Sequence, residues 1–90
     1  MKESKLGLET LAVHAGEGPC EATGALDTPV YMSNTFVAGS TDELAARFTE
    51  EKPGYVYTRY SNPTIKALEE KVAALEGGEA AVAMASGMAA

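Results

Sequence analysis

The chain of 90 residues has the size of one small domain. Its hydrophobic content of 46% is ordinary for a globular protein, but much of it is alanine, and the aromatic residues are two Phe and four Tyr. A deep independent core is therefore not expected. The net charge of −6, with 7 basic against 13 acidic residues and no basic stripe, argues against non-specific binding to nucleic acid or to an anionic membrane.

Few single residues suggest reactive chemistry. Cys20 is the only cysteine, so no internal disulfide can form, and its turn-rich surroundings indicate an ordinary thiol. His14 is the only histidine, and without a second His or a nearby Cys it is interpreted as structural rather than as a metal ligand. No apolar run approaches the roughly 20 residues of a membrane span or has the form of a signal peptide, so the expected location is the cytoplasm.

The first forty residues contain many Gly and Pro and show little periodicity. Short helical or extended pieces are expected there only at 8–13 and 30–36. We interpret this segment as an extended arm, because its apolar side chains need a surface that the segment can hardly supply. A short helix is expected to follow, with Thr41 as its N-cap and two acidic residues in its first turn.

The best-defined element is a helix over residues 63–76. Asn62 is the expected N-cap, and Pro63 suits the first helical position because its missing N–H is not needed there. The Gly77-Gly78 pair is expected to end the helix. One face carries an apolar stripe of Ile65, Leu68, Val72 and Leu75, and the opposite side, expected to face solvent, carries Lys66, Glu69, Glu70 and Lys71.

A continuous apolar run at 80–85 follows the helix. It lacks polar alternation, which predicts a strand buried on both faces, as in a parallel sheet covered by helices. Ser86-Gly87 then suggests a turn into another helix. The succession of helix, strand and turn predicts an α/β domain.

Two short motifs could hold a phosphate group. At Ser86-Gly87-Met88, a strand that turns into a helix leaves backbone N–H groups free for an anion. Tyr57 and Arg59 alternate along an extended segment, so a hydroxyl and a guanidinium fork are expected to face one target. On the residues alone, a simple N-cap at Ser86 and a solvated Arg59 beside a packed Tyr57 stay open as alternatives.

Five pieces in order resemble the pyridoxal-phosphate (PLP) enzymes of cysteine and methionine metabolism, a family that includes methionine γ-lyase, cystathionine γ-synthase and O-acetylhomoserine sulfhydrylase. They are Thr10–Gly16, Pro29-Val30-Tyr31 with Thr35-Phe36, Tyr57-Thr58-Arg59 with Asn62-Pro63-Thr64, Leu75–Gly78, and Ala85–Ala89. The resemblance covers the whole chain and corresponds to about the N-terminal quarter of the family's fold.

The resemblance implies an aspartate-aminotransferase-like fold of type I. Residues 1–60 would be an extended arm on a partner subunit, and residues 61–90 the incomplete start of the large PLP-binding α/β domain. A homotetramer, built as a dimer of dimers, is the expected assembly.

The resemblance also implies roles for single residues. Tyr57 and Arg59 correspond to a pair that crosses the subunit interface and binds the cofactor phosphate of the neighbouring chain. Ser86, Gly87 and Met88 correspond to the phosphate cup of the chain's own cofactor. In some members the counterpart of Tyr57 also lies near the leaving group, which implies a catalytic proton-transfer role.

The implied reaction is β- or γ-elimination, or γ-replacement, on a sulfur amino acid or an O-acylated homoserine. Its Schiff-base lysine, the acid at the pyridine nitrogen and the ring-stacking tyrosine are expected beyond Ala90, so these 90 residues alone should not be catalytic. A non-catalytic oligomerisation or complementing fragment and a small stand-alone phosphate-binding domain are the alternatives. The choice between lyase and transferase, and the substrate, are left open.

Overall fold

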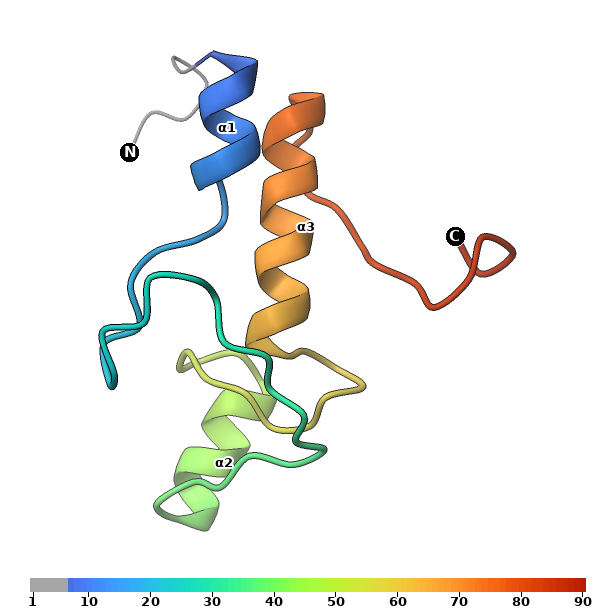
Figure 1. Cartoon of the computed structure of the whole chain (residues 1–90). Coiled ribbons are helices and arrows are strands. Elements are labelled where there is room, and N and C mark those ends of the chain that lie inside the picture. The colour runs from blue at the N-terminus through green and yellow to red at the C-terminus, as the bar shows by residue number, and fades with distance from the viewer. Residues whose placement is uncertain (1–6) are drawn as a thin grey trace. The chain divides into compact units, whose positions relative to one another are not determined.

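The computed structural model describes residues 7–90. This part of the chain forms three helices, α1 (Leu8–His14), α2 (Thr41–Phe48) and α3 (Pro63–Glu76) (Figure 1). It divides into two compact units, one made of the described part of Met1–Val30 with Thr64–Ala90 and the other of Tyr31–Pro63. Within residues 7–90, no helix is both long and apolar enough to cross a membrane.

In the first unit, residues 8–13 are helical, which is one of the two conformations expected for them. Their helix, α1, lies beside α3 (Figure 1). Leu11 and Ala15, which are 7% and 3% exposed, supply the small apolar core. Gly16 follows with a φ of +75°, and a Cβ there would stand 2.6 Å from the Ala67 carbonyl oxygen of α3. Because only glycine tolerates both the φ value and this approach, Gly16 fixes how closely the α1 segment packs on α3.

The apolar stripe of α3 is largely uncovered, which differs from the usual burial of such a face. Ile65, Leu68 and Val72 are 38%, 54% and 40% exposed. Part of the charged side, expected to face solvent, makes the contacts instead. Lys71 Nζ lies 2.5 Å from Glu17 Oε2, and the Glu69 carboxylate accepts a hydrogen bond of 2.8 Å from the Ala83 N–H.

The predicted ends of α3 are confirmed at Pro63 and Glu76. Gly77 adopts a φ of +68°, and its N–H donates to the Ala74 carbonyl while the Gly78 N–H donates to that of Ala73. This pair of bonds is a Schellman motif, which satisfies carbonyls that the helix end would leave without partners. The Gly77-Gly78 stop therefore acts as the sequence indicates.

The expected N-cap of α2 is wrong by one residue. Ser40, not Thr41, is the N-cap, and its side chain accepts a hydrogen bond of 3.1 Å from the Glu43 N–H. The Glu43 carboxylate accepts in turn from the Gly39 N–H at 2.7 Å. Ser40 and Glu43 thus form a reciprocal arrangement like a capping box, and this spacing favours Ser40 over its neighbour.

The strand expected at 80–85 does not form, and no strand occurs in residues 7–90. Val82 and Met84 are 72% and 54% exposed, so the run is not buried on both faces. A strand requires a neighbour for its backbone groups, and no described segment pairs with this one. The run at 30–36, expected to be helical or extended, forms no helix, and Thr35 makes an isolated antiparallel bridge with Tyr57.

Candidate functional site

Tyr57 and Arg59 lie in the unit Tyr31–Pro63, where a turn rather than an extended segment brings them together. Tyr57 ends a short antiparallel contact, in which the Thr58 N–H donates to the Asn34 carbonyl at 2.8 Å. The chain then turns, because the N–H groups of Tyr60 and Ser61 both donate to the Tyr57 carbonyl, at 2.9 and 3.1 Å. The expected pair is therefore present, but the expected alternation of an extended backbone is wrong.

The Arg59 guanidinium lies over two aromatic rings. Its Cζ is 5.6 Å from the Tyr57 ring centroid and 5.9 Å from that of Tyr60. The two tyrosine rings meet edge to face, with centroids 6.3 Å apart. Arg59 forms no ion pair with any carboxylate of residues 7–90. Its five N–H donors are thus not committed to a described carboxylate and suit an anionic ligand.

Asn62 fastens this turn to the preceding segment. It directly precedes α3, is 2% exposed, and its side-chain amide donates to the Tyr31 carbonyl at 3.0 Å and to Thr58 Oγ1 at 3.2 Å. The Thr58 hydroxyl in turn donates to the Ser33 carbonyl. A buried side-chain amide that donates to two segments in this way holds them in one arrangement. The sequence predicts a helix cap at Asn62 and gives no signal for these contacts with residues 31 and 58.

Ser86, Gly87 and Met88 lie in the other unit, on an exposed single turn. The Ser86 carbonyl accepts from the N–H groups of Ala89 and Ala90, at 3.2 and 3.3 Å, and its hydroxyl accepts from Ala89 at 3.2 Å. The N–H groups of Gly87 and Met88 take no part in these bonds. A Cβ at Gly87 would meet nothing within 4 Å. The turn has the hydrogen bonding of a helix start, but the expected helix is not formed within residues 86–90. Two backbone donors remain available to an anion.

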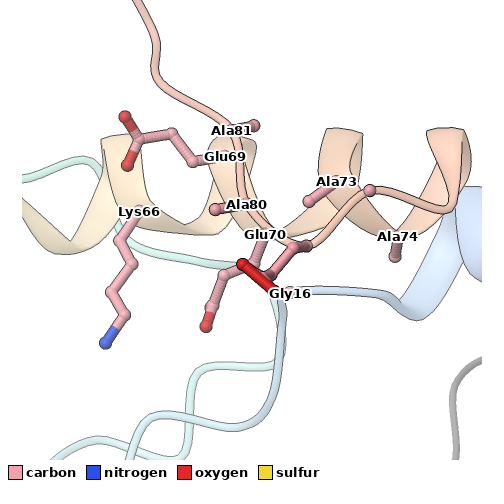
Figure 2. Close-up of a pocket in the computed structure, with 10 residues that line it drawn as sticks. Gly16, Lys66, Glu69, Glu70, Ala73, Ala74, Ala80 and Ala81 are labelled. Carbon is pink, nitrogen blue, oxygen red and sulfur yellow. The ribbon is translucent and has the colours of Figure 1, made fainter.

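A pocket of 490 Å³ lies along α3 (Figure 2). Figure 2 shows Gly16, Glu70, Ala73 and Ala80 around it. Its charged lining residues are Lys66, Glu69, Glu70 and Glu79, so carboxylates outnumber cations. None of the sequence-predicted site residues lines this pocket, and its excess of negative charge does not suit a phosphate.

Away from both motifs, Glu17 is the centre of a polar cluster. The pKa of Glu17 is lowered to about 2, chiefly by the hydrogen bond from Lys71 and then by the hydroxyl and N–H of Thr28 and the charge of Lys71. The Thr28 hydroxyl donates to Glu17 Oε1 at 2.8 Å. One carboxylate thus joins the segment after α1, the loop near Thr28 and helix α3. No signal in the sequence could pair residues 54 positions apart.

Comparison with known proteins identifies the family to which the chain is similar. The family model described as Cys/Met metabolism PLP-dependent enzyme matches residues 9–90. The L-methionine gamma-lyase of Fusobacterium nucleatum subsp. polymorphum is 49% identical over 88 residues, which are 98% of this chain and 22% of that protein. The O-acetyl-L-homoserine sulfhydrylase of Corynebacterium glutamicum is 46% identical over 84 residues, or 93% of this chain and 19% of that protein.

A solved structure is similar to this chain in both fold and sequence. The metY protein of Campylobacter jejuni, whose structure contains N'-pyridoxyl-lysine-5'-monophosphate, aligns with a TM-score of 0.86 at 35% sequence identity. The alignment covers 96% of this chain and 21% of that protein. The chain therefore spans about a fifth of the length of the relatives that it matches.

Proposed function

Because the chain belongs to the family of Cys/Met metabolism PLP-dependent enzymes, we propose that it is part of an enzyme that eliminates or replaces a group on a sulfur amino acid or an O-acylated homoserine. The family match over residues 9–90 is the observation that carries this proposal. The names of the two relatives, a lyase and a sulfhydrylase, support these two reaction types. When bound, pyridoxal 5'-phosphate supplies the electron sink that stabilises negative charge at the substrate's Cα.

The donor sets of the two motifs fit the cofactor phosphate. Arg59 offers a planar fork of N–H groups, and Tyr57, an exposed residue, offers a hydroxyl. The other motif offers the N–H groups of Gly87 and Met88 together with the Ser86 hydroxyl. All of these groups are hydrogen-bond donors and none is a carboxylate, which is the composition that a phosphate dianion requires.

We assign the two motifs to two active sites of one dimer. Ser86, Gly87 and Met88 bind the phosphate in the chain's own site, and Tyr57 and Arg59 reach the phosphate in the partner's site. We also assign to the Tyr57 hydroxyl a proton-transfer role near the leaving group. The exposed apolar side chains of the arm support its contact with a partner subunit, since Met32 and Val37 are 94% and 92% exposed. A dimer of dimers completes the proposed assembly.

Residues 61–90 are proposed to begin the large α/β domain of the enzyme. In that domain the apolar stripe of α3 and the run at 80–85 acquire the neighbours that they lack among the described residues. The Schiff-base lysine is proposed to lie elsewhere in the enzyme. Lys52 and Lys66 are exposed and Lys71 is engaged by Glu17, so these lysines lack the desolvation that a reactive amine needs.

A mixing experiment tests this proposal in the protein expressed from its complete gene. Arg59→Ala removes the proposed cross-subunit donor, and Gly87→Val fills the proposed phosphate cup. We expect each variant alone to bind pyridoxal 5'-phosphate about tenfold or more weakly, because charge-assisted hydrogen bonds to the phosphate are lost or blocked. Activity is measured as release of α-keto acid from L-methionine and as sulfide-dependent consumption of O-acetyl-L-homoserine.

Subunits of the two variants are then dissociated, mixed and reassembled. A hybrid dimer contains one site with an intact cup from one subunit and an intact Arg59 from the other, so activity should partly return. If both motifs serve the same chain's site, mixing restores nothing, and the assignment to two sites is wrong. If Arg59→Ala leaves cofactor affinity unchanged, Arg59 is not a phosphate ligand.

A further inference from the structure

We propose that Tyr60 is a positioning residue for Arg59: its ring holds the guanidinium in the orientation that meets the cofactor phosphate. This inference rests on the proposed role of Arg59 as a phosphate ligand. It assigns a role to a residue that neither the sequence motifs nor the two phosphate-binding motifs include. Arg59 has no carboxylate partner within residues 7–90, so its guanidinium is oriented by the aromatic rings beside it.

The Tyr60 ring is a second aromatic contact of the guanidinium, next to that of Tyr57. Arg59 Cζ is 5.9 Å from the Tyr60 ring centroid and 5.6 Å from that of Tyr57, both within the range of a cation–π contact. Tyr57 is itself a proposed ligand of the phosphate, so the orientation of its ring must also bring its hydroxyl to the phosphate. No ligand role is proposed for the Tyr60 hydroxyl, so its ring can be oriented for the contact with Arg59 alone.

Tyr60 is in turn held by contacts of its own. Its ring packs against Phe48 at the end of α2, with centroids 5.4 Å apart and planes inclined by 59°. Its backbone N–H donates to the Tyr57 carbonyl at 2.9 Å. A long arginine side chain loses much conformational freedom when it binds an anion, and a support that restricts it beforehand reduces that cost. Phe48 and Tyr60 together provide such a support.

The ring, rather than the hydroxyl, carries the proposed role. A cation–π contact depends on the negative face of the aromatic ring, which phenylalanine shares with tyrosine. Tyr60→Phe should therefore preserve the effect. Tyr60→Leu retains apolar bulk but removes the aromatic face, and Tyr60→Met does the same with a flexible side chain in case the leucine variant does not fold.

The experiment uses the protein expressed from its complete gene, stripped of cofactor and titrated with pyridoxal 5'-phosphate while visible absorbance is followed. We expect Tyr60→Leu and Tyr60→Met to weaken binding about two- to fivefold, as loss of an exposed cation–π contact predicts. Tyr60→Phe should bind like the wild type. In a protein that already carries Arg59→Ala, Tyr60→Leu should have no further effect, because the group that it positions is absent.

Three outcomes would overturn the inference. They are equal losses in Tyr60→Phe and Tyr60→Leu, an undiminished loss in the Arg59→Ala background, and wild-type affinity in the leucine and methionine variants. The first would assign the effect to the hydroxyl, and the second would make Tyr60 independent of Arg59. Failure of the proposed function is recognised separately, since Arg59→Ala by itself would then leave the affinity for the cofactor unchanged.

Discussion

The two faces of α3 differ in what they contact. On the polar side, Gly16 approaches the backbone at Ala67 and Lys71 pairs with Glu17, and on the other flank of the apolar stripe Glu69 accepts from Ala83. The apolar stripe itself, which includes Leu68, remains 38% to 54% exposed at its first three positions. The charged face thus organises the described unit, while the apolar face lacks a partner within it. Hydrophobic periodicity identifies the face that needs covering, but it does not say which segment covers it.

The largest expected effect concerns the apolar stripe. If residues 61–90 begin a larger α/β domain, Leu68 is buried there, and Leu68→Asp should lower the free energy of unfolding by about 3 kcal/mol or more. The measurement is urea unfolding of the protein expressed from its complete gene. Leu68→Met, which keeps apolar volume, is the matched control and should cost less than about 1.5 kcal/mol. If the two variants unfold alike, the stripe faces solvent in the whole protein as well.

A smaller effect is expected on the opposite face, at Gly16. A Cβ there would stand 2.6 Å from the Ala67 carbonyl oxygen and 3.0 Å from the Lys71 backbone nitrogen, at a φ of +75°. Gly16→Ala should therefore reduce the free energy of unfolding by about 2 kcal/mol, the order of a strained backbone residue. At Gly18 a Cβ would meet nothing within 4 Å, so Gly18→Ala should stay within about 0.5 kcal/mol of the wild type. Equal effects at the two glycines would show that the close approach to α3 is not what constrains Gly16.

Local signals predicted most of the helical structure. Pro63 and the Gly77-Gly78 pair mark the ends of α3, because proline position and glycine φ act within a few residues. The N-cap of α2 was placed one residue late, since Thr41 and Ser40 are both good caps and only the position of Glu43 separates them. The apolar run at 80–85 was interpreted as a buried strand, but a strand depends on neighbours that its own residues do not specify.

The residues of the candidate site stay a prediction, and the backbone geometry expected for Tyr57 and Arg59 was wrong. Tyr57 and Arg59 were chosen for their spacing, yet it is the turn through Tyr60 that brings them together. Tyr60 could have been noticed only as an aromatic residue adjacent to a candidate ligand. Tyr60 contacts Phe48, which lies a dozen residues earlier in the sequence, and this contact depends on where α2 ends. Such contacts follow from tertiary packing, which periodicity and spacing do not encode.

The smallest expected effect is a pH dependence of the charged face. Hydrogen bonds from Lys71 and Thr28 lower the pKa of Glu17 from 4.5 to about 2. Because the folded-state pKa lies below the unfolded one, the stabilisation is fully present above about pH 4.5 and is lost as the pH falls towards about 2. Both partners are partly exposed, so solvent screening keeps the effect modest.

The matched variants for this effect are Glu17→Gln and Glu21→Gln. Glu17→Gln should reduce the free energy of unfolding at neutral pH, and its difference from the wild type should shrink as the pH falls through the window from about 4.5 to about 2. Glu21 is exposed and forms no ion pair with the described residues, so Glu21→Gln should follow the wild-type pH profile. Urea unfolding across this range gives both profiles. A constant difference between Glu17→Gln and the wild type would mean that the contact with Lys71 acts through packing and shape, and not through the charge of Glu17.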